Sequence, residues 1–387
     1  MKRFQKIAAI VFVALLFLPV LQRSLKIFPK IELAGVEGDV RKPKLNVRTW
    51  FSGDWQREYD QYFTSKIGLR GQLVRTWNQF NFTLFGKVNR HQGTPVIVGR
   101  NHWMYEQVYI DTYNKADDTA DKALRERVRE VKRLQDELAK RHIAFALVIA
   151  PSKVEIMPEY VPDGMLKPGR DARRTAYDRM APMLVEAGVN LVDAHRFFVE
   201  QKPKLPHPLF ARGGVHWSYY GAGFIVEQLV GQIERQTGRD LVHIACTNVV
   251  VDDVPFGTDN DLGDLLNLWQ RKSLAGPQVH PVFERRASPR VFRPNVLVVG
   301  DSFARTLVEI MQEQDIDASC DILFYLNRRF SFPGDIETPL DRHTVDWKRE
   351  ILKRDAVVVE LNEYWLPEIG FGFLHRALEA LGVPPDA

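Results

Sequence analysis

The chain has 387 residues, of which 45% are hydrophobic and 26% are charged, with a formal net charge of +4 at pH 7. This balance is typical of a globular protein with one large domain or two modest ones, and the sequence contains no repeats or low-complexity tracts. Basic and acidic residues alternate, as in the segment 122–140, so the charge pattern argues against a nucleic-acid-binding surface.

The first 22 residues differ from the rest. Lys2, Arg3 and Lys6 precede the charge-free run 7–21, which is long for a signal-peptide core and shorter than the ~20 residues of a full span. Because no small-x-small cleavage site follows, we predict an uncleaved signal anchor over 1–22; a cleaved signal peptide and a buried core helix are the alternatives. The basic cluster favours a cytoplasmic N-terminus. The prediction is therefore a single-pass protein of the inner membrane with its globular part in the periplasm.

Two cysteines, Cys246 and Cys320, leave a single disulfide open as an option for an exported protein. No Cys/His cluster has the spacing of metal ligands, so we predict no metal site and no bound cofactor.

A juxtamembrane linker is predicted over 23–50, followed by helical periodicity over 54–85. Gly68 and Gly71 indicate a break between two helices. We expect the aromatic stripe of this segment to pack against a domain core, with a sugar platform as the alternative. Its members are Trp55, Tyr59, Tyr62, Phe63, Leu69, Leu73, Trp77, Phe80 and Leu84.

Strands and helices alternate through the remaining chain. Long apolar runs such as 143–150 are typical of parallel strands covered on both faces. The alternation predicts an α/β fold, a mainly parallel sheet between two layers of helices, in one domain over 51–387. Strands are expected at 96–98, 143–150, 189–192, 296–299, 322–326 and 356–361, and helices at 121–141, 171–187, 218–235, 302–314 and 372–381.

One apolar strand ends in Gly300-Asp301-Ser302-Phe303, just before a helical pattern. A serine at this position stands at the carboxyl edge of the sheet, where α/β proteins bind ligands, and its backbone N–H would favour a developing oxyanion. Serine needs a base, and His216 is the candidate. We expect Asp301 to hold the turn through backbone hydrogen bonds. A simple polar turn is the alternative for any lone Gly-Asp-Ser.

Further motifs accompany these residues in a fixed order. Over about residues 50–370 the chain resembles the SGNH hydrolase-like domain of the alginate O-acetyltransferase (AlgJ/AlgX-like) family. The resemblance implies a three-layer α/β/α, flavodoxin-like fold with the histidine before the serine in sequence. The motifs are Gln56 to Arg70, Gly99-x-x-x-Trp103-Met104-Tyr105, Ala150-Pro151-Ser152-Lys153, Pro158-Glu159-Tyr160-Val161-Pro162, His216-Trp217-Ser218-x-x-Gly221-Ala222, Gly263-Asp264-Leu265, Gly300-Asp301-Ser302-Phe303 and Val359-Glu360-Leu361-Asn362-Glu363.

The resemblance implies that Ser302 is the nucleophile and His216 the base. The family's orienting aspartate should stand at position 214, where this chain has Gly214. Glycine cannot accept the Nδ1–H hydrogen bond that fixes the imidazole tautomer. Three explanations are open: another carboxylate, with Asp193 and Asp264 as candidates; a backbone carbonyl; or weak or lost catalysis.

Other polar residues are candidates for supporting roles. Tyr325, Asn327 and Arg328 are candidate contacts to an oxyanion or an acidic sugar, with a solvated loop as the alternative. Lys153 is expected to be a solvated turn residue, and Trp217 either a pocket wall or part of the core.

The resemblance implies an extracytoplasmic polysaccharide O-acetyltransferase that works through an acyl-enzyme at Ser302. Its partners would be a secreted polysaccharide as acceptor and a membrane-bound O-acyltransferase as acetyl donor. One alternative is a carbohydrate esterase. The other is a non-catalytic, membrane-anchored polysaccharide-binding or assembly protein, and the glycine in place of an aspartate at position 214 favours this second alternative.

Overall fold

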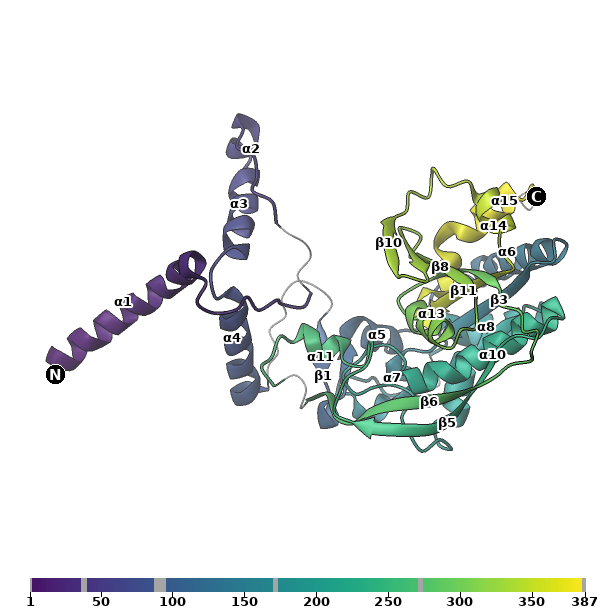
Figure 1. Cartoon of the computed structure of the whole chain (residues 1–387), viewed down its shortest axis with the longest axis horizontal. Helices are drawn as coiled ribbons and strands as arrows, with labels where there is room; N and C mark the ends of the chain where they lie inside the picture. The colour runs from purple at the N-terminus through teal and green to yellow at the C-terminus, as the bar shows by residue number, and fades with distance from the viewer. Residues whose placement is uncertain (1, 36–39, 87–94, 170–172, 271–273, 385–387) are drawn as a thin grey trace. The chain divides into compact units, whose positions relative to one another are not determined.

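The structure, a computed structural model, describes residues 2–35, 40–86, 95–169, 173–270 and 274–384 (Figure 1). The chain divides into two compact units. One contains Met1–Val96 with Gly263–Arg271, and the other contains Ile97–Leu262 with Lys272–Ala387.

The first unit is helical. Its helices are α1 (Lys2–Leu25), α2 (Val47–Phe51), α3 (Asp54–Ser65) and α4 (Arg70–Phe85). Within α1, Arg3–Leu25 is long and apolar enough to cross a membrane, and none of that segment is buried. Helix α2 begins inside the predicted linker. The break between α3 and α4 lies where Gly68 predicted it.

The aromatic stripe of this unit is not core packing, contrary to the prediction. Phe63, Leu73, Trp77, Phe80 and Leu84 each expose half or more of their side chains. The opposite face of α4 is packed instead. A Cβ on Gly71 would lie 2.2 Å from the carbonyl oxygen of Ile31, and the Asn78 side chain donates to the Leu266 carbonyl over 2.9 Å. Periodicity identified the helix but could not tell which of its faces is covered.

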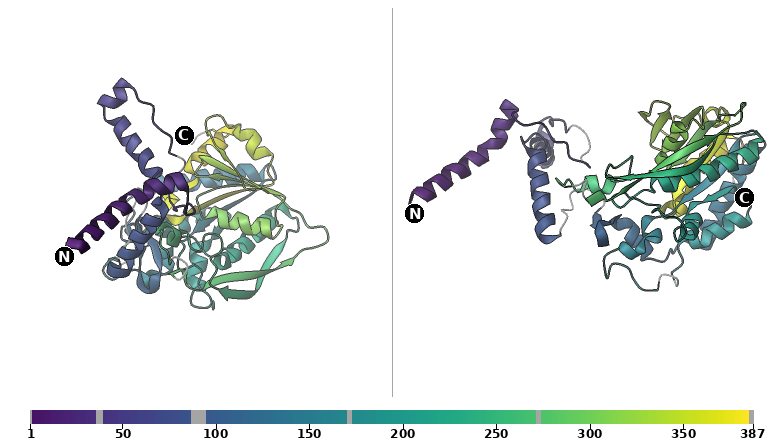
Figure 2. Two further views of the ribbon diagram at one scale, coloured as in Figure 1. Left: turned by 60° about the vertical axis from the view of Figure 1, so that its left-hand side comes forward. Right: turned by 60° about the horizontal axis from the view of Figure 1, so that its bottom comes forward.

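The second unit is built on a seven-stranded sheet with the order β10-β9-β8-β7-β11-β3-β4 (Figure 2). The five strands from β8 to β4 are parallel, and β9 and β10 are antiparallel additions at one edge. The carboxyl ends of the central strands are aligned, since Asn362 pairs with Ala150. The strands are β3 (Ala144–Ala150), β4 (Leu191–Asp193), β7 (Asn295–Gly300), β8 (Ser319–Phe324), β9 (Arg328–Phe332), β10 (Ile336–Pro339) and β11 (Ala356–Asn362).

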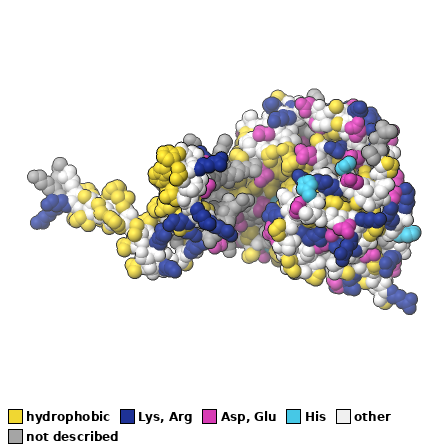
Figure 3. Space-filling view, turned by 90° about the horizontal axis from the view of Figure 1, so that it is seen from above, with side chains coloured by type: hydrophobic (Ala, Val, Ile, Leu, Met, Phe, Trp, Pro, Cys, Tyr) yellow, Lys and Arg dark blue, Asp and Glu magenta, His cyan; other side chains and the backbone are white. Residues whose placement is uncertain are grey.

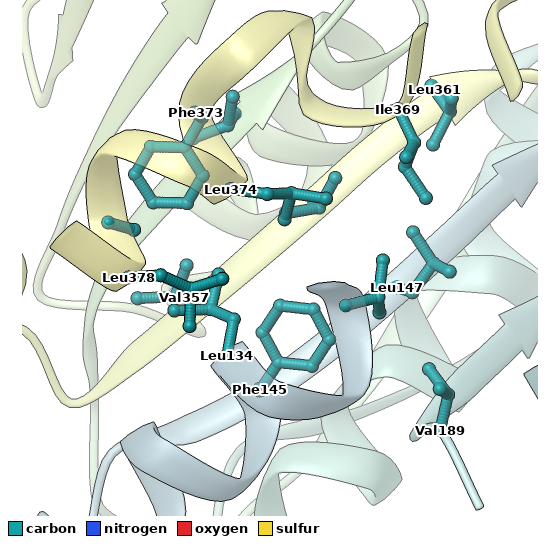
Figure 4. Packing of buried hydrophobic residues seen from close by; sticks show 14 of the residues in the cluster. Leu134, Phe145, Leu147, Val189, Val357, Leu361, Ile369, Phe373, Leu374 and Leu378 are labelled. Atoms are coloured by element: carbon teal, nitrogen blue, oxygen red, sulfur yellow. The ribbon is translucent and has the colours of Figure 1, made fainter. Parts of the chain in front are cut away.

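Helices cover both faces of this sheet, as predicted. One face packs against α6 (Asp121–Ala139), α8 (Ala176–Glu186), α14 (Trp347–Leu352) and α15 (Phe373–Ala380). The main hydrophobic core lies there, and Figure 4 shows Leu134 and Phe373 packed over strand residues Phe145, Leu147 and Val357. The other face carries α9 (Ala194–Gln201), α10 (Tyr219–Thr237) and α13 (Ala304–Glu313). The α/β fold with a mainly parallel sheet is confirmed.

The remaining elements are short or lie outside the main sheet. An antiparallel hairpin of β5 (His243–Asp252) and β6 (Gln278–Arg286) packs on α10 and was not predicted. The predicted helix at 171–187 begins at Ala176, and its expected residues 171 and 172 lie outside the described residues. Cys246 and Cys320 are both free thiols. The other elements are β1 (Val96–Val98), η1 (Arg100–His102), β2 (Met104–Glu106), α5 (Gln107–Tyr113), α7 (Lys153–Ile156), η2 (Pro158–Tyr160), α11 (Asp261–Leu265) and η4 (Glu363–Gly372).

Candidate active site

Ser302 lies half-buried in the turn between β7 and α13. Asp301 holds this turn, as predicted: its Oδ1 accepts from the Phe303 N–H over 2.9 Å and its Oδ2 from the Asn362 N–H over 2.6 Å. The second bond ties the turn to the end of β11. Gly300 is required by close packing, because a Cβ there would lie 2.8 Å from Oε2 of Glu360.

His216 lies against this turn. Its ring makes an edge contact with Phe303, with ring centroids 4.8 Å apart, and its side chain is buried. The Nδ1 atom is hydrogen-bonded to Oδ2 of Asp261 over 2.6 Å. Among the residues that the structure describes, Nε2 has no hydrogen-bond partner. The nitrogen that a base would use is therefore free, and the other nitrogen is oriented by a carboxylate.

Asp261 is itself held in place. Its Oδ1 accepts the backbone N–H of Val215 over 2.8 Å and that of Leu262 over 2.7 Å. Burial lowers the pKa of His216, but the charge and hydrogen bond of Asp261 raise it, and the net shift is upward from 6.5. Asp301 and Glu106 act in the same direction. These surroundings favour the imidazolium that forms when a histidine base takes up a proton.

The candidates for the orienting carboxylate were therefore wrong. Asp193 accepts the Tyr177 hydroxyl, 3.0 Å from each carboxylate oxygen, and the Arg196 N–H at the start of α9. Asp264 lies in the short segment that belongs to the first unit. The Nδ1 hydrogen bond of His216 is made by Asp261, three residues earlier in the chain than Asp264.

Gly214 leaves room for this arrangement. A Cβ at position 214 would lie 2.6 Å from the carbonyl oxygen of Thr258 and 3.2 Å from backbone atoms of Asp259. The segment that ends in Asp261 thus runs in close contact with the backbone before His216. A side chain at 214 would push the two segments apart.

Lys153 acts as a clamp on residues 211–214, the loop that leads to His216, contrary to the expectation of a solvated lysine. Its side chain is almost fully buried, and Nζ donates to the carbonyls of Ala211, Arg212 and Gly214 over 2.7, 2.9 and 2.7 Å. The ammonium also lies 5.0 Å from the ring centroid of Trp103. Burial lowers the pKa of Lys153 well below 10.5. The lysine thus satisfies three carbonyls and fixes the path of the chain into His216.

Tyr325 is the one of the three supporting candidates that lies close to Ser302. The side chain and backbone of Ser302 are near enough to its phenol to lower the pKa of Tyr325, although burial outweighs them. Burial and the charge of Asp301 raise the pKa of Tyr325 to about 12, so it remains a neutral phenol. Arg328 pairs with Glu337 over 3.2 Å across the β9–β10 hairpin, and Asn327 is exposed at the start of that hairpin.

The floor of the site is buried and contains a second carboxyl. Glu360 on β11 is fully buried beside Asp301, and burial together with the Asp301 charge raises its pKa well above 4.5. Trp217 is also fully buried and packs edge-on against Phe303, so it belongs to the core and not to a pocket wall. Among the described residues, no three His, Cys, Asp or Glu side chains form a group that could hold a metal ion.

A cavity of about 390 Å³ lies behind Tyr325. Trp365 and Phe371 form an aromatic wall with Tyr325, with ring centroids 5.2 to 5.9 Å apart. Arg127, Arg342, Glu130 and Glu368 line the same cavity, and Arg127 pairs with Glu130 over 2.8 Å, so the charges of the lining balance. Aromatic side chains with a few polar groups are a common lining for small-molecule pockets.

The sequence singled out Ser302 and His216 as candidates, and the structure places His216 against the Ser302 turn; the sequence did not indicate Asp261 or the clamp of Lys153. Asp261 stands 45 residues after His216, and no local pattern sets it apart from its neighbour Asp259. A weak signal existed for Lys153, because it belongs to the Pro151-Ser152-Lys153 motif.

The chain is similar to known proteins. A family model described as "SGNH hydrolase-like domain, acetyltransferase AlgX" matches residues 96–314. A "Probable alginate O-acetylase AlgJ" of Azotobacter vinelandii is 26% identical over 184 residues, 46% of this chain and 42% of that protein. A protein of the same description from Pseudomonas aeruginosa is 21% identical over 323 residues, 77% of this chain and 72% of that protein.

Among solved structures, the O-acetyltransferase domain of Pseudomonas putida AlgJ aligns with a TM-score of 0.45 and 18% identity, covering 71% of this chain and 93% of that one. The family match at residues 96–314 covers more than half of the 387 residues and contains the Ser302 turn, His216 and Asp261. The chain belongs to the AlgX-type family of SGNH hydrolase-like acetyltransferases.

Proposed function

We propose that the chain is an extracytoplasmic polysaccharide O-acetyltransferase with Ser302 as nucleophile, His216 as base and Asp261 as the orienting carboxylate. The observation that carries the proposal is the hydrogen bond of 2.6 Å between His216 Nδ1 and Asp261. Without it, Gly214 would leave the base unoriented and would favour a non-catalytic protein. With it, every role of a Ser-His-Asp triad has a residue beside one turn.

The chemistry follows from these roles. His216 Nε2 takes the proton of the Ser302 hydroxyl as Oγ attacks the acyl carbonyl of the donor. The protonated imidazole then gives this proton to the leaving group, and an acyl-serine remains. In the second half, Nε2 takes the proton of a sugar hydroxyl, whose oxygen attacks the acyl carbonyl. The new ester leaves, and the proton returns to Ser302.

Two features outside the proposed triad support the proposal: a cavity that could hold a sugar acceptor, and a helix that could place the chain beside a membrane-bound acetyl donor. The cavity lined by Tyr325 offers the Trp365 ring and polar side chains such as Arg342 to a polysaccharide. Helix α1 is long and apolar enough to anchor the chain, and we propose that it spans the inner membrane once with the second unit in the periplasm. The acetyl donor would then be a membrane-bound O-acyltransferase, because an activated acetyl group must reach this side of the membrane.

Acyl transfer can be tested on a single peptide. Trypsin releases residues 291–305, in which Ser302 is the only hydroxyl side chain. Incubation of the full chain with para-nitrophenyl acetate should add one acetyl group to this peptide. The Ser302→Ala variant should release no burst of nitrophenol and carry no label on the peptide. An equal burst from that variant would place the chemistry elsewhere.

The fate of the acyl group separates transferase from esterase. A polysaccharide acceptor should speed the loss of acetyl from Ser302 and appear as an O-acetylated product. Loss at the same rate with and without acceptor, with free acetate as the product, would indicate an esterase. Mass spectrometry of the purified chain tests the anchor, since a mature N-terminus beyond residue 22 would refute it.

A further inference from the structure

Helix α4 presents an apolar stripe that the described residues of its own unit leave exposed. Leu73, Trp77, Phe80 and Leu84 fall within a sector of about 60° at 100° per residue, and half or more of each side chain is exposed. The opposite face is packed, since Asn78 donates to the Leu266 carbonyl. Single exposed apolar residues are common, but four on one helix face indicate a binding surface.

The unit that carries this stripe is strongly basic. Residues 1–96 contain 16 Lys and Arg and 6 Asp and Glu, a net charge of +10 in a chain whose total is +4. Arg41, Lys42, Lys44 and Arg48 are exposed just before and within α2. Figure 3 shows hydrophobic side chains gathered on the N-terminal part of the chain with Lys and Arg beside them. Basic residues flanking an apolar helix face are typical of helices that lie on anionic lipid.

The contact between the end of α1 and the turn before α4 fixes the depth of the stripe relative to the membrane. A Cβ on Gly68 would lie 2.1 Å from the carbonyl oxygen of Pro19 and 3.0 Å from the backbone nitrogen of Arg23. The turn before α4 therefore contacts the last part of the apolar helix. With Arg3 and Lys6 at the cytoplasmic face, this contact lies at the outer boundary of the membrane.

The length of the apolar run in α1 also indicates that α4 lies at the membrane boundary. Its 15 charge-free residues, 7–21, rise about 22 Å as a helix, less than the ~30 Å of a hydrocarbon core. The segment Arg3–Leu25 is long enough to cross as a whole, so its polar ends lie in the boundary on either side of this run, and flanking residues are drawn toward the boundary with them. Trp and Phe side chains are the ones favoured at that boundary.

We infer that α4 lies on the outer surface of the bilayer that α1 spans. The Leu73–Trp77–Phe80–Leu84 stripe is buried at the boundary between headgroups and acyl chains, and the basic residues at 41–48 contact anionic headgroups. This inference rests on the membrane-spanning role proposed for α1 and is independent of the acyl chemistry at Ser302. It gives the first unit a function, which is to bind the membrane surface through α4.

The test is a depth measurement on the full chain in lipid nanodiscs. Phe80→Cys, made in a Cys246→Ser background, carries an environment-sensitive fluorophore. Thr83→Cys, exposed on the flank of the same helix, is the matched control, and Leu15→Cys in α1 is the reference for spanning. The label at 80 should shift to the blue and be quenched by lipid with a spin label near the headgroup. The label at 83 should remain open to aqueous iodide.

The role of the basic residues at 41–48 is tested by varying the lipid composition of the nanodiscs. Quenching at position 80 should increase when phosphatidylglycerol is added to phosphatidylcholine. The triple change Arg41→Gln, Lys42→Gln and Lys44→Gln should abolish that increase. Ser302→Ala should leave every depth signal unchanged, which separates this inference from the catalytic proposal.

Three results would overturn the inference. Equal iodide quenching at 80 and 83, with lipid quenching at 15, would leave the anchor and remove the surface contact. A signal at 80 that changes on dilution with unlabelled protein would assign the stripe to a second copy. A purified chain that begins beyond residue 22 would remove both the span and the surface contact.

Discussion

Replacing Asp261 with asparagine should disable the base with little change in shape. Oδ1 of Asp261 accepts two backbone N–H groups, from Val215 and Leu262, and Oδ2 faces Nδ1 of His216. In an asparagine, the carbonyl oxygen must stay with the two backbone donors. The amide nitrogen then faces Nδ1, which has to accept instead of donate. The ring proton moves to Nε2, and the base can no longer take up the serine proton.

The size of the effect follows from the lost tautomer. The same change in a serine-protease triad lowers turnover roughly 10⁴-fold, a known worked case. We expect a loss of roughly 10³- to 10⁴-fold in acylation of Ser302, about 4 to 5.5 kcal/mol of transition-state stabilisation. The pH profile should move as well. The base must be neutral, and because Asp261 raises the pKa of His216 above 6.5, the acidic limb of activity should lie above pH 6.5 and move down in the variant.

The assay is the nitrophenol burst, with acetylation of peptide 291–305 followed in parallel. Asp193→Asn and Asp264→Asn are matched controls, because each removes a carboxylate from a candidate that the structure does not place on His216. Both should acylate Ser302 at the wild-type rate. The reasoning would be refuted if Asp261→Asn acylated normally, or if Asp193→Asn lost activity while Asp261→Asn kept it.

Three further changes test the surroundings. Gly214→Asp should lower both activity and stability, because the new Cβ would lie 2.6 Å from the Thr258 carbonyl oxygen. Urea unfolding should show a loss of about 1–3 kcal/mol in the free energy of unfolding, and a gain in turnover would contradict the prediction. Lys153→Met should cost about 3 kcal/mol or more in the same measurement, because three buried carbonyls lose their donor, and an unchanged midpoint would count against the clamp. Tyr325→Phe should lower Ser302 acylation roughly 10²-fold with unchanged urea unfolding, whereas a faster burst would mean that the phenol blocks the site.

Much of the fold could be predicted because parallel strands leave a strong pattern. The runs that became β3, β7 and β11 are buried on both faces, so nearly every residue is apolar and the strand is visible without an alignment. The β5–β6 hairpin was missed because it packs on α10 by one face only. Its residues from Val249 to Asp252 are largely exposed, so the hairpin has only the short apolar run 249–251 and not the long buried run of a central strand.

The site was predictable where chemistry is local in sequence. Ser302 stands directly after its strand, and the helix expected from residue 218 is observed as α10, where Ser218 is the N-cap and accepts the Gly221 N–H over 3.2 Å. Lys153 was misread because a lysine at a strand end is usually solvated. Its burial depends on three carbonyls from residues about 60 positions later, which sequence distance conceals.

Gly214 and Asp261 are two parts of one arrangement. A carboxylate two residues before the base reaches the imidazole from its own strand of chain. Here the carboxylate comes from a separate segment that packs against the backbone at position 214. A Cβ at that position would lie only 2.6 Å from the Thr258 carbonyl oxygen, so the close approach requires glycine. Asp261 then uses one oxygen to bind the Val215 N–H and the other to bind His216, so it fixes the loop and the tautomer together. In the triad that we propose, Gly214 is therefore the residue that lets the segment carrying Asp261 reach His216.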